Sequence, residues 1–218
     1  KITGEKINLV ASGRTDSGVH ALAQVAHFDT QSRISPEKFA YALNSGLPSD
    51  IRVQYSESCD DTFHARFCVM KKHYRYTVWN APHASVFLRN TSLHLHYQID
   101  LDRLNEDAAS ILGCHDFAAF QASGSTIENT VRTIYKSKWT KDGNLLVYDV
   151  CGSGFLYNMV RILVGTMLET GMFQRDAGTL RLALESGRRS DLGATAPACG
   201  LALSRVEYEG FDTADYMN

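Results

Sequence analysis

Short stretches rich in β-branched and aromatic residues recur along the chain and predict β-strands. They cover residues 7–11, 24–30, 51–57, 72–79, 91–97, 131–139, 145–151 and 201–208. Most of these stretches come in neighbouring pairs. The chain is therefore expected to build much of its structure from antiparallel sheet.

Helical signals lie between these pairs of strands. Ser35 is a typical N-cap residue, Pro36 follows at a favoured first helical position, and Gly46 can end that helix. Further helices are expected over residues 101–112, 155–170 and 176–186, each followed by a glycine. Strands in pairs around helices predict an α+β fold, not strict alternation of strand and helix. Two ferredoxin-like halves, residues 1–66 and 67–218, would account for the order.

Composition narrows the class of protein without identifying a partner. Hydrophobic residues make up 44% of the 218 positions, and no apolar run is long enough to span a bilayer. The net charge is −2, so a nucleic-acid site would need a local basic surface. Five scattered cysteines without a C-x-x-C pair favour reduced thiols in the cytoplasm. The start at Lys1, without methionine or a signal pattern, is typical of the middle of a longer chain.

One loop carries a carboxylate between two glycines. Residues 12–21 read SGRTDSGVHA, with Asp16 between Gly13 and Gly18. A tight turn would account for the glycines, and a cap would account for the aspartate. A catalytic carboxylate is the other interpretation, and it needs a partner elsewhere in the chain.

Arg161 is the candidate partner. It lies in the otherwise apolar run 155–164, and a guanidinium cannot shed its charge when it is buried. Arg161 must either reach solvent at the edge of the helix or pair with a carboxylate. Bidentate pairing with Asp16 would keep that carboxylate ionised and oriented as a nucleophile or base.

Residues 71–79 combine tyrosines with lysine, histidine and arginine. Alternation along a strand would place Tyr74, Tyr76 and Val78 on one face and the intervening side chains on the other. Bases stack on aromatic rings and cations neutralise phosphates, so this mixture suits RNA. A strand with a tyrosine-lined core face explains it equally well.

Two other patterns carry weaker signals. The Gly152-Ser153-Gly154 sequence lacks the third glycine and the acidic partner of a dinucleotide fingerprint, so a tight strand-to-helix turn is the simpler interpretation. His94 and His96 lie two apart with Asp100 nearby, but no further ligand motif supports a metal site. We expect neither a nucleotide cofactor nor a metal.

Several blocks together resemble the tRNA pseudouridine synthase A family. They are GRTDSGVHA at 13–21, FHARF at 63–67, KHYRY at 72–76, GSGFLYNMVR at 152–161 and TAPACGLAL at 195–203. The short sequences HDF at 115–117 and RTI at 132–134 also fit. The resemblance extends, in order, over nearly the whole chain.

The resemblance implies a fold, an activity and partners. The fold would be a pseudouridine synthase fold, in which two ferredoxin-like halves join their antiparallel sheets around a central basic cleft. The activity would be isomerisation of uridines 38–40 in the anticodon stem-loop of tRNA to pseudouridine. Family members work without metal or organic cofactor, usually as homodimers. They normally have a first strand and helix before the block that begins at Lys1, so the half formed by residues 1–66 is expected to be incomplete.

The resemblance also implies roles for particular residues. Asp16 matches the essential aspartate, Tyr74 the aromatic residue that stacks on the target uracil, and Arg161 the basic residue that pairs with the aspartate. The phenol of Tyr74 could also assist removal of the proton from C5. Arg14, Arg66 and Lys72 are expected to bind the RNA. The alternative from another class is a non-catalytic RNA-binding module.

Overall fold

The largest element of the fold is a sheet of eight strands. A computed structural model describes residues 2–122, 124 and 127–216 of the chain. The strands of the sheet are β2 (His20–Ala21), β4 (Val69–Asn80), β5 (Leu93–Leu95), β6 (Gly113–Asp116), β7 (Val131–Asp142), β8 (Leu145–Gly152), β9 (Leu201–Tyr208) and β10 (Phe211–Asp212). Six follow the order β10-β9-β4-β8-β7-β6 with antiparallel pairing. β2 pairs in parallel with β9, and β5 in parallel with β4.

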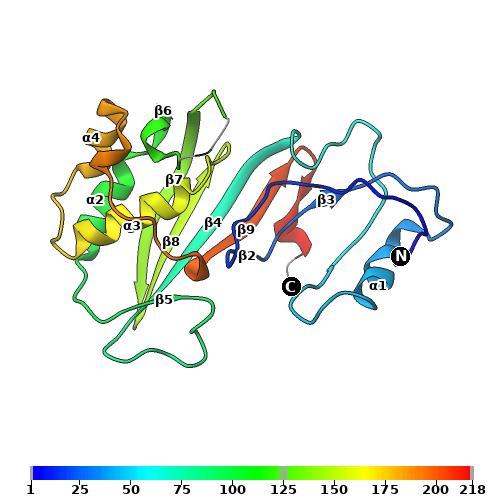
Figure 1. Ribbon diagram of the computed structural model, residues 1–218, viewed down its shortest axis with the longest axis horizontal. Helices are drawn as coiled ribbons and strands as arrows, with labels where there is room; N and C mark the ends of the chain where they lie inside the picture. Colours follow the sequence, from blue (N-terminus) through cyan, green and yellow to red (C-terminus); the bar gives the residue numbers. More distant parts are fainter. Residues whose placement is uncertain (1, 123, 125–126, 217–218) are drawn as a thin grey trace.

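Helices cover one end of this sheet. α2 (Leu101–Ser110), α3 (Met159–Gly171) and α4 (Thr179–Ser186) lie over β6, β7 and β8, whereas α1 (Phe39–Asn44) lies at the opposite end of the molecule (Figure 1). Short 3₁₀ helices occur at Pro36–Lys38, Ala118–Phe120, Arg189–Asp191, Ala198–Gly200 and Thr213–Tyr216. No helix in the described ranges is long and apolar enough to cross a membrane.

The main core lies between the sheet and helices α2 and α3. The buried rings of Trp139 and Tyr148 stack there with their centroids 5.1 Å apart. The indole N–H of Trp139 donates to the sulfur of Met167 on α3 over 3.3 Å. Nearly every position of α3 is buried, which explains why this helix is mostly apolar, with Arg161 and Glu169 as its charged residues. This packing holds α3 in place and so positions Arg161, which lies near its N-terminus.

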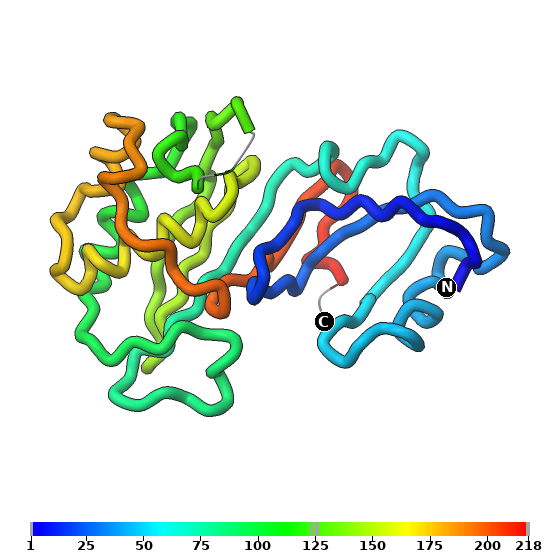
Figure 2. The backbone as a smooth tube through the Cα atoms, viewed as in Figure 1, coloured from blue at the N-terminus to red at the C-terminus, as the bar shows by residue number. Residues whose placement is uncertain are grey.

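A second, smaller core joins segments from both ends of the chain. Leu203 and Val206 of β9 pack there with Phe63 and Val69. Figure 2 shows the N-terminal segment, in blue, beside the C-terminal strands, in red. Residues on both sides of the expected boundary at 66/67 therefore share one core, and the boundary itself stays a prediction.

A small antiparallel sheet leads into the glycine-flanked loop. It pairs β1 (Val10–Ala11) with β3 (Ala26–His27). β1 runs directly into residues 12–19, and β2 follows them. Because β2 is paired with β9, strands hold the loop at both of its ends.

Seven of the eight expected strands are present at least in part, but the prediction for residues 51–57 is wrong. That segment runs along α1 without joining a strand in the described part of the chain. Asn44 Nδ2 donates to the carbonyl of Val53, and the amide of Val53 donates to Asn44 Oδ1, both over 2.8 Å. One side-chain amide thus satisfies the backbone groups that a neighbouring strand would take.

Two helices begin later than expected. α3 starts at Met159 rather than 155, because Asn158 has φ 60° and ψ 3°, a left-handed conformation that cannot continue a right-handed helix. α4 starts at Thr179 rather than 176, after Gly178 with φ 83°. Ser35 precedes the first helical turn as expected, but its side chain makes no capping bond.

The mixture of helices and a many-stranded sheet is consistent with a pseudouridine synthase fold. The expectation of α+β architecture with mainly antiparallel sheet is therefore confirmed. The two ferredoxin-like halves and the central basic cleft stay predictions.

Candidate active site

The loop between β1 and β2 presents Asp16 on a tight turn. The amide of Val19 donates to the carbonyl of Asp16 over 3.0 Å, and Gly18, the third residue of the turn, has φ 82°. A side chain at position 18 would be strained in this conformation, which explains the glycine. The turn fixes the backbone of Asp16 and leaves its carboxylate half-buried.

A hydrogen-bond network anchors the start of this loop. The hydroxyl of the buried Ser12 donates to Gln24 Oε1 over 2.7 Å, and its carbonyl accepts from Lys72 Nζ over 2.6 Å. Gln24 donates in turn to the carbonyl of Gly13 over 2.9 Å. A Cβ on Gly13 would lie 2.9 Å from the Lys72 amine, so this glycine makes room for the lysine. Both glycines beside Asp16 therefore serve the geometry of the loop itself.

Lys72 belongs to the support of the loop. Burial lowers the pKa of its ammonium to about 8, and the positive charge of Arg66 adds to the effect. The sequence predicts that Lys72 binds RNA, but its amine is already bonded to a carbonyl of the chain. Lys72 therefore supports the loop, and its predicted contact with RNA stays a prediction.

Asp16 and Arg161 meet across the gap between the loop and α3. Arg161 NH1 donates to Asp16 Oδ2 over 2.9 Å, and the two side chains are 18% and 27% exposed, so water screens the pair only in part. The expected bidentate geometry is wrong, because Nε of Arg161 donates to the carbonyl of Ala196 over 2.7 Å instead. In the described part of the chain, no group donates to the other carboxylate oxygen, Asp16 Oδ1.

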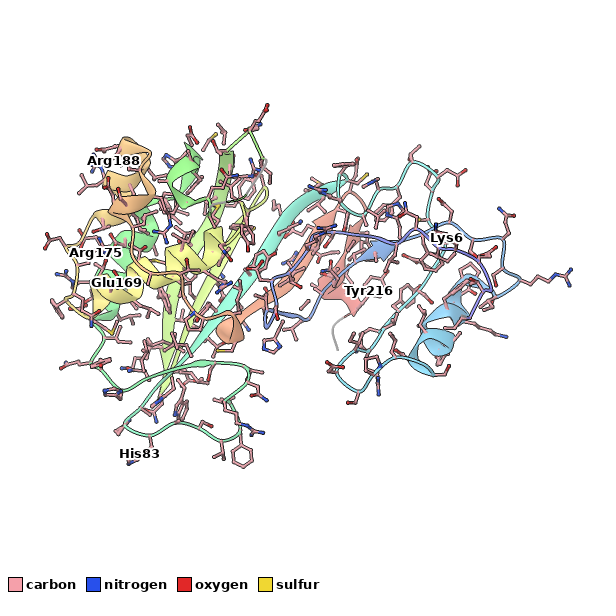
Figure 3. The ribbon with its side chains drawn as sticks, in the orientation of Figure 1. Lys6, His83, Glu169, Arg175, Arg188 and Tyr216 are labelled. Carbon is pink, nitrogen blue, oxygen red and sulfur yellow. The ribbon has the colours of Figure 1, made fainter. Side chains whose placement is uncertain are left out.

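A strap formed by residues 193–197 crosses one side of α3 and fixes Arg161. Amides of the strap donate to Thr166 Oγ1, to Glu169 Oε1 and to the carbonyl of Arg161, over 3.0, 2.8 and 3.0 Å. Glu169 also pairs with Arg175 over 2.9 Å, and both lie at the helical end of the molecule (Figure 3). The guanidinium of Arg161 is thus held by a backbone that is itself bonded to the same helix.

Tyr74 lies close enough to Asp16 for the carboxylate to affect it. Burial raises the pKa of the Tyr74 phenol to about 12, and the negative charge of Asp16 adds to the effect. Its ring meets Phe155 edge-on, with centroids 5.2 Å apart. Tyr76, on the same strand face, is fully buried and donates to the carbonyl of Pro197 over 2.8 Å. Tyr76 is thus structural, whereas Tyr74 is within reach of the negative charge of Asp16.

Two exposed arginines of the predicted site have no carboxylate partner among the described residues. They are Arg14, next to the Asp16 turn, and Arg66, whose guanidinium lies over the ring of Phe67 at 5.6 Å from its centroid. Arg181, by contrast, is paired with Glu185. Unpaired guanidinium groups are suited to contact phosphates.

Two of the residues considered as metal ligands, His94 and Asp100, have hydrogen-bond partners within the chain. His94 Nε2 lies 2.8 Å from the carbonyl of Ala81, and Asp100 caps α2 by accepting two backbone amides. His94 and His96 have ring centroids 6.4 Å apart. Within the residues that the structure describes, no group of three or more potential metal ligands comes together.

Two groups that were not predicted from the sequence touch the guanidinium of Arg161. One is the carbonyl of Ala196, and the other is Asn158 Oδ1, which accepts from Arg161 NH1 over 2.9 Å. A backbone carbonyl carries no side-chain signal. Asn158 did carry a signal in the sequence, because it stands three residues before Arg161, a spacing at which side chains meet on a helix.

Comparison with known proteins identifies the family. A family model described as tRNA pseudouridine synthase matches residues 1–68 and 108–209. The chain is 45% identical over 205 residues to tRNA pseudouridine synthase A of Bacillus subtilis (strain 168), across 94% of this chain and 83% of the relative. It is 43% identical over 207 residues to the protein of the same name from Acetivibrio thermocellus, across 95% and 85%. It is also 45% identical over 206 residues to the protein of the same name from Geobacillus kaustophilus, across 94% of this chain and 80% of that relative. The chain therefore belongs to the tRNA pseudouridine synthase A family, and pseudouridine synthases are isomerases.

Proposed function

We propose that this chain isomerises uridine to pseudouridine in the anticodon stem-loop of tRNA, with Asp16 as the catalytic carboxylate. The observation that carries the proposal is the contact between Asp16 and Arg161. One oxygen of Asp16 is held at 2.9 Å by a guanidinium that is always charged, and the other accepts nothing from the described residues. An oriented carboxylate with one free oxygen suits nucleophilic or base catalysis.

The proposed reaction balances without a second substrate. The C1′–N1 bond breaks, the uracil rotates, a C1′–C5 bond forms, C5 releases its proton, and N1 takes one up. We assign Oδ1 of Asp16 either to attack on C1′ or to removal of a ribose proton, and both roles need the same free oxygen. The target nucleotide must leave its stack first, because its reacting atoms are inaccessible within a stem.

Tyr74 is the proposed stacking surface for the flipped uracil. Phe155 contacts its ring edge-on and so limits how the ring can turn. With a pKa of about 12, the phenol is protonated at neutral pH and is a poor acceptor for the C5 proton. We therefore propose that Tyr74 stacks and donates a hydrogen bond rather than acting as the base.

Arg14 and Arg66 are the proposed phosphate contacts. Both are exposed and lack an ion-pair partner in the described ranges. Arg14 lies in the loop, and the charge of Arg66 acts on Lys72, which supports the loop. The names of the relatives specify tRNA, and we extend that substrate to this chain. The choice of the anticodon stem-loop rests on the resemblance of the motifs.

Tritium release from C5-labelled uridine in unmodified tRNA tests the proposal. Isomerisation replaces the C5–H bond by a C5–C1′ bond, so turnover must release the label. A non-catalytic RNA-binding module, the alternative function, would bind the same tRNA and release none. Loss of label only from uridines outside the anticodon stem-loop would contradict the proposed substrate site.

Two further proposals concern the assembly and the place of action. We propose that the chain works as a homodimer in the cytoplasm, as the resemblance implies. Light scattering without tRNA would show a mass of two chains if the first proposal holds, and a mass of one chain would contradict it.

A further inference from the structure

Asn158 has a backbone conformation that side chains rarely adopt. Its φ is 60° and its ψ is 3°, and among the described non-glycine residues only Phe173, with φ 58°, shares a positive φ. Asparagine tolerates this conformation better than most residues, but it still costs free energy relative to glycine. Such strain at the N-terminus of α3 calls for a compensating role of the side chain.

The turn that contains Asn158 resembles the turn that presents Asp16. The amide of Met159 donates to the carbonyl of Leu156 over 3.1 Å, and Asn158 is the third residue of that turn. In the Asp16 turn the third residue is Gly18, with φ 82°. The turn at α3 thus has a side chain where glycine would be the easier residue.

The side chain of Asn158 does not cap the helix. Asparagine is a favoured N-cap residue, yet its amide accepts no backbone N–H of the first turn of α3. Its Oδ1 instead accepts from Arg161 NH1 over 2.9 Å, the same nitrogen that donates to Asp16 Oδ2. The half-buried amide of Asn158 therefore binds the guanidinium of Arg161 instead of capping the helix.

These contacts use every hydrogen on one nitrogen of Arg161. NH1 carries two hydrogens, and they point to Asp16 and to Asn158. The adjacent Nε donates to the carbonyl of Ala196 over 2.7 Å. With three acceptors around a planar group, the guanidinium cannot rotate away from Asp16 without breaking at least one hydrogen bond.

We propose that Asn158 is a positioning residue that aims the guanidinium of Arg161 at Asp16. Asn158 acts through Arg161 and does not itself contact the reacting atoms. The inference rests on the proposed catalytic role of Asp16.

The test compares Asn158→Gly with the wild-type chain. Glycine suits the left-handed backbone and removes only the amide, so we expect the variant to fold with a similar melting temperature. We expect kcat for pseudouridine formation to fall about tenfold, the effect of losing one hydrogen bond to a charged group, with KM for tRNA little changed. Phe173→Gly is the matched control, because it relieves the same backbone strain at the far end of α3 and should leave kcat unchanged.

A double-mutant cycle with Arg161→Lys shows whether Asn158 acts through Arg161. Lysine has no NH1 for Asn158 to hold, so adding Asn158→Gly should then cost little more. Wild-type kcat in Asn158→Gly, or a tenfold loss that is fully additive in the cycle, would overturn the inference.

Asp16→Asn, measured in parallel, separates the two proposals. If Asp16→Asn is inactive and Asn158→Gly is normal, only the positioning role fails. If Asp16→Asn keeps its activity, the proposed function fails, and the positioning role fails with it.

Discussion

Arg161 distributes its hydrogen bonds over three acceptors: the Asp16 carboxylate, the Asn158 amide and the Ala196 carbonyl. The charge of a residue in an apolar helix was enough to predict that it needs a partner. The glycine-flanked Asp16 was the candidate partner, and the resemblance of the motifs implied the same pair. It could not be predicted that Arg161 contacts Asp16 through NH1 alone. That geometry depends on the carbonyl of Ala196, which comes from a distant strap and occupies Nε.

Arg161→Lys should lower the single-turnover rate about 10-fold to 100-fold. Lysine keeps the positive charge but cannot reach three acceptors in one plane. The rate of pseudouridine formation under enzyme excess measures the effect, and a tRNA-binding assay serves as the control for folding. A rate close to that of the wild type would show that charge alone suffices at this position.

Lys72 should make the stability of the protein depend on pH. Burial lowers the pKa of its ammonium from 10.5 to about 8, so between these values the unfolded chain binds more protons than the folded one. The wild-type chain should therefore become more stable, relative to Lys72→Met, as the pH rises from 7 to 10. The expected gain is on the order of 2 kcal/mol after allowing for partial exposure.

Urea denaturation of both proteins at the two pH values measures this difference. Lys138→Met, which removes an exposed lysine from β7, gives the baseline for loss of a positive charge. A constant difference between wild type and Lys72→Met across the pH range would argue against the buried ammonium.

The helix α3 and the strap (residues 193–197) pack and hydrogen-bond together as one structural unit. The strap lies so close to α3 that a Cβ on Gly165 would sit 1.8 Å from the carbonyl oxygen of Ala194. The strands that build the sheet were predictable from β-branched and aromatic residues, and β9 was predicted with its observed bounds. The segment 51–57 and the start of α3 were not, because side-chain bonds from Asn44 and the left-handed Asn158 override local propensity.

Gly165→Ala should displace the strap from α3. We expect the free energy of unfolding to fall by about 2 kcal/mol, the usual cost of overpacking, and kcat to fall because Ala196 moves away from Arg161. Gly46→Ala is the control, since a Cβ there would meet nothing within 4 Å. Thermal unfolding and turnover, measured on both variants, check the prediction. Equal melting temperatures for the two variants would contradict the close contact.

The whole molecule carries a small net negative charge, so any attraction for tRNA has to come from local positive charge. The net charge of −2 does not attract tRNA, so we expect binding to depend on local cations, with Arg14 and Arg66 as the proposed contacts. Composition excluded a polycationic protein but did not show which arginines are unpaired. Whether an arginine is paired depends on contacts between segments that are far apart in the sequence, and composition does not contain them.

Arg14→Ala and Arg66→Ala should each weaken tRNA binding and reduce the slope of log affinity against log salt by about 1. Arg181→Ala should change neither, because Arg181 is already paired with Glu185 on α4. Binding titrations at several salt concentrations test this. An unchanged slope for both Arg14→Ala and Arg66→Ala would mean that the tRNA backbone lies elsewhere.

The substitution Asp16→Asn, measured for both pseudouridine formation and tRNA binding, decides whether Asp16 is catalytic. The change keeps the size of the side chain and removes the charge that faces Arg161. Asp149→Asn is the matched control, because Asp149 is similarly half-buried and pairs with Arg75 on the other face of the sheet. We expect Asp16→Asn to lose turnover by about 10⁴-fold or more while its Kd for tRNA stays within a few fold. Turnover near that of the wild type, or parallel loss of turnover and binding, would contradict a catalytic role for Asp16.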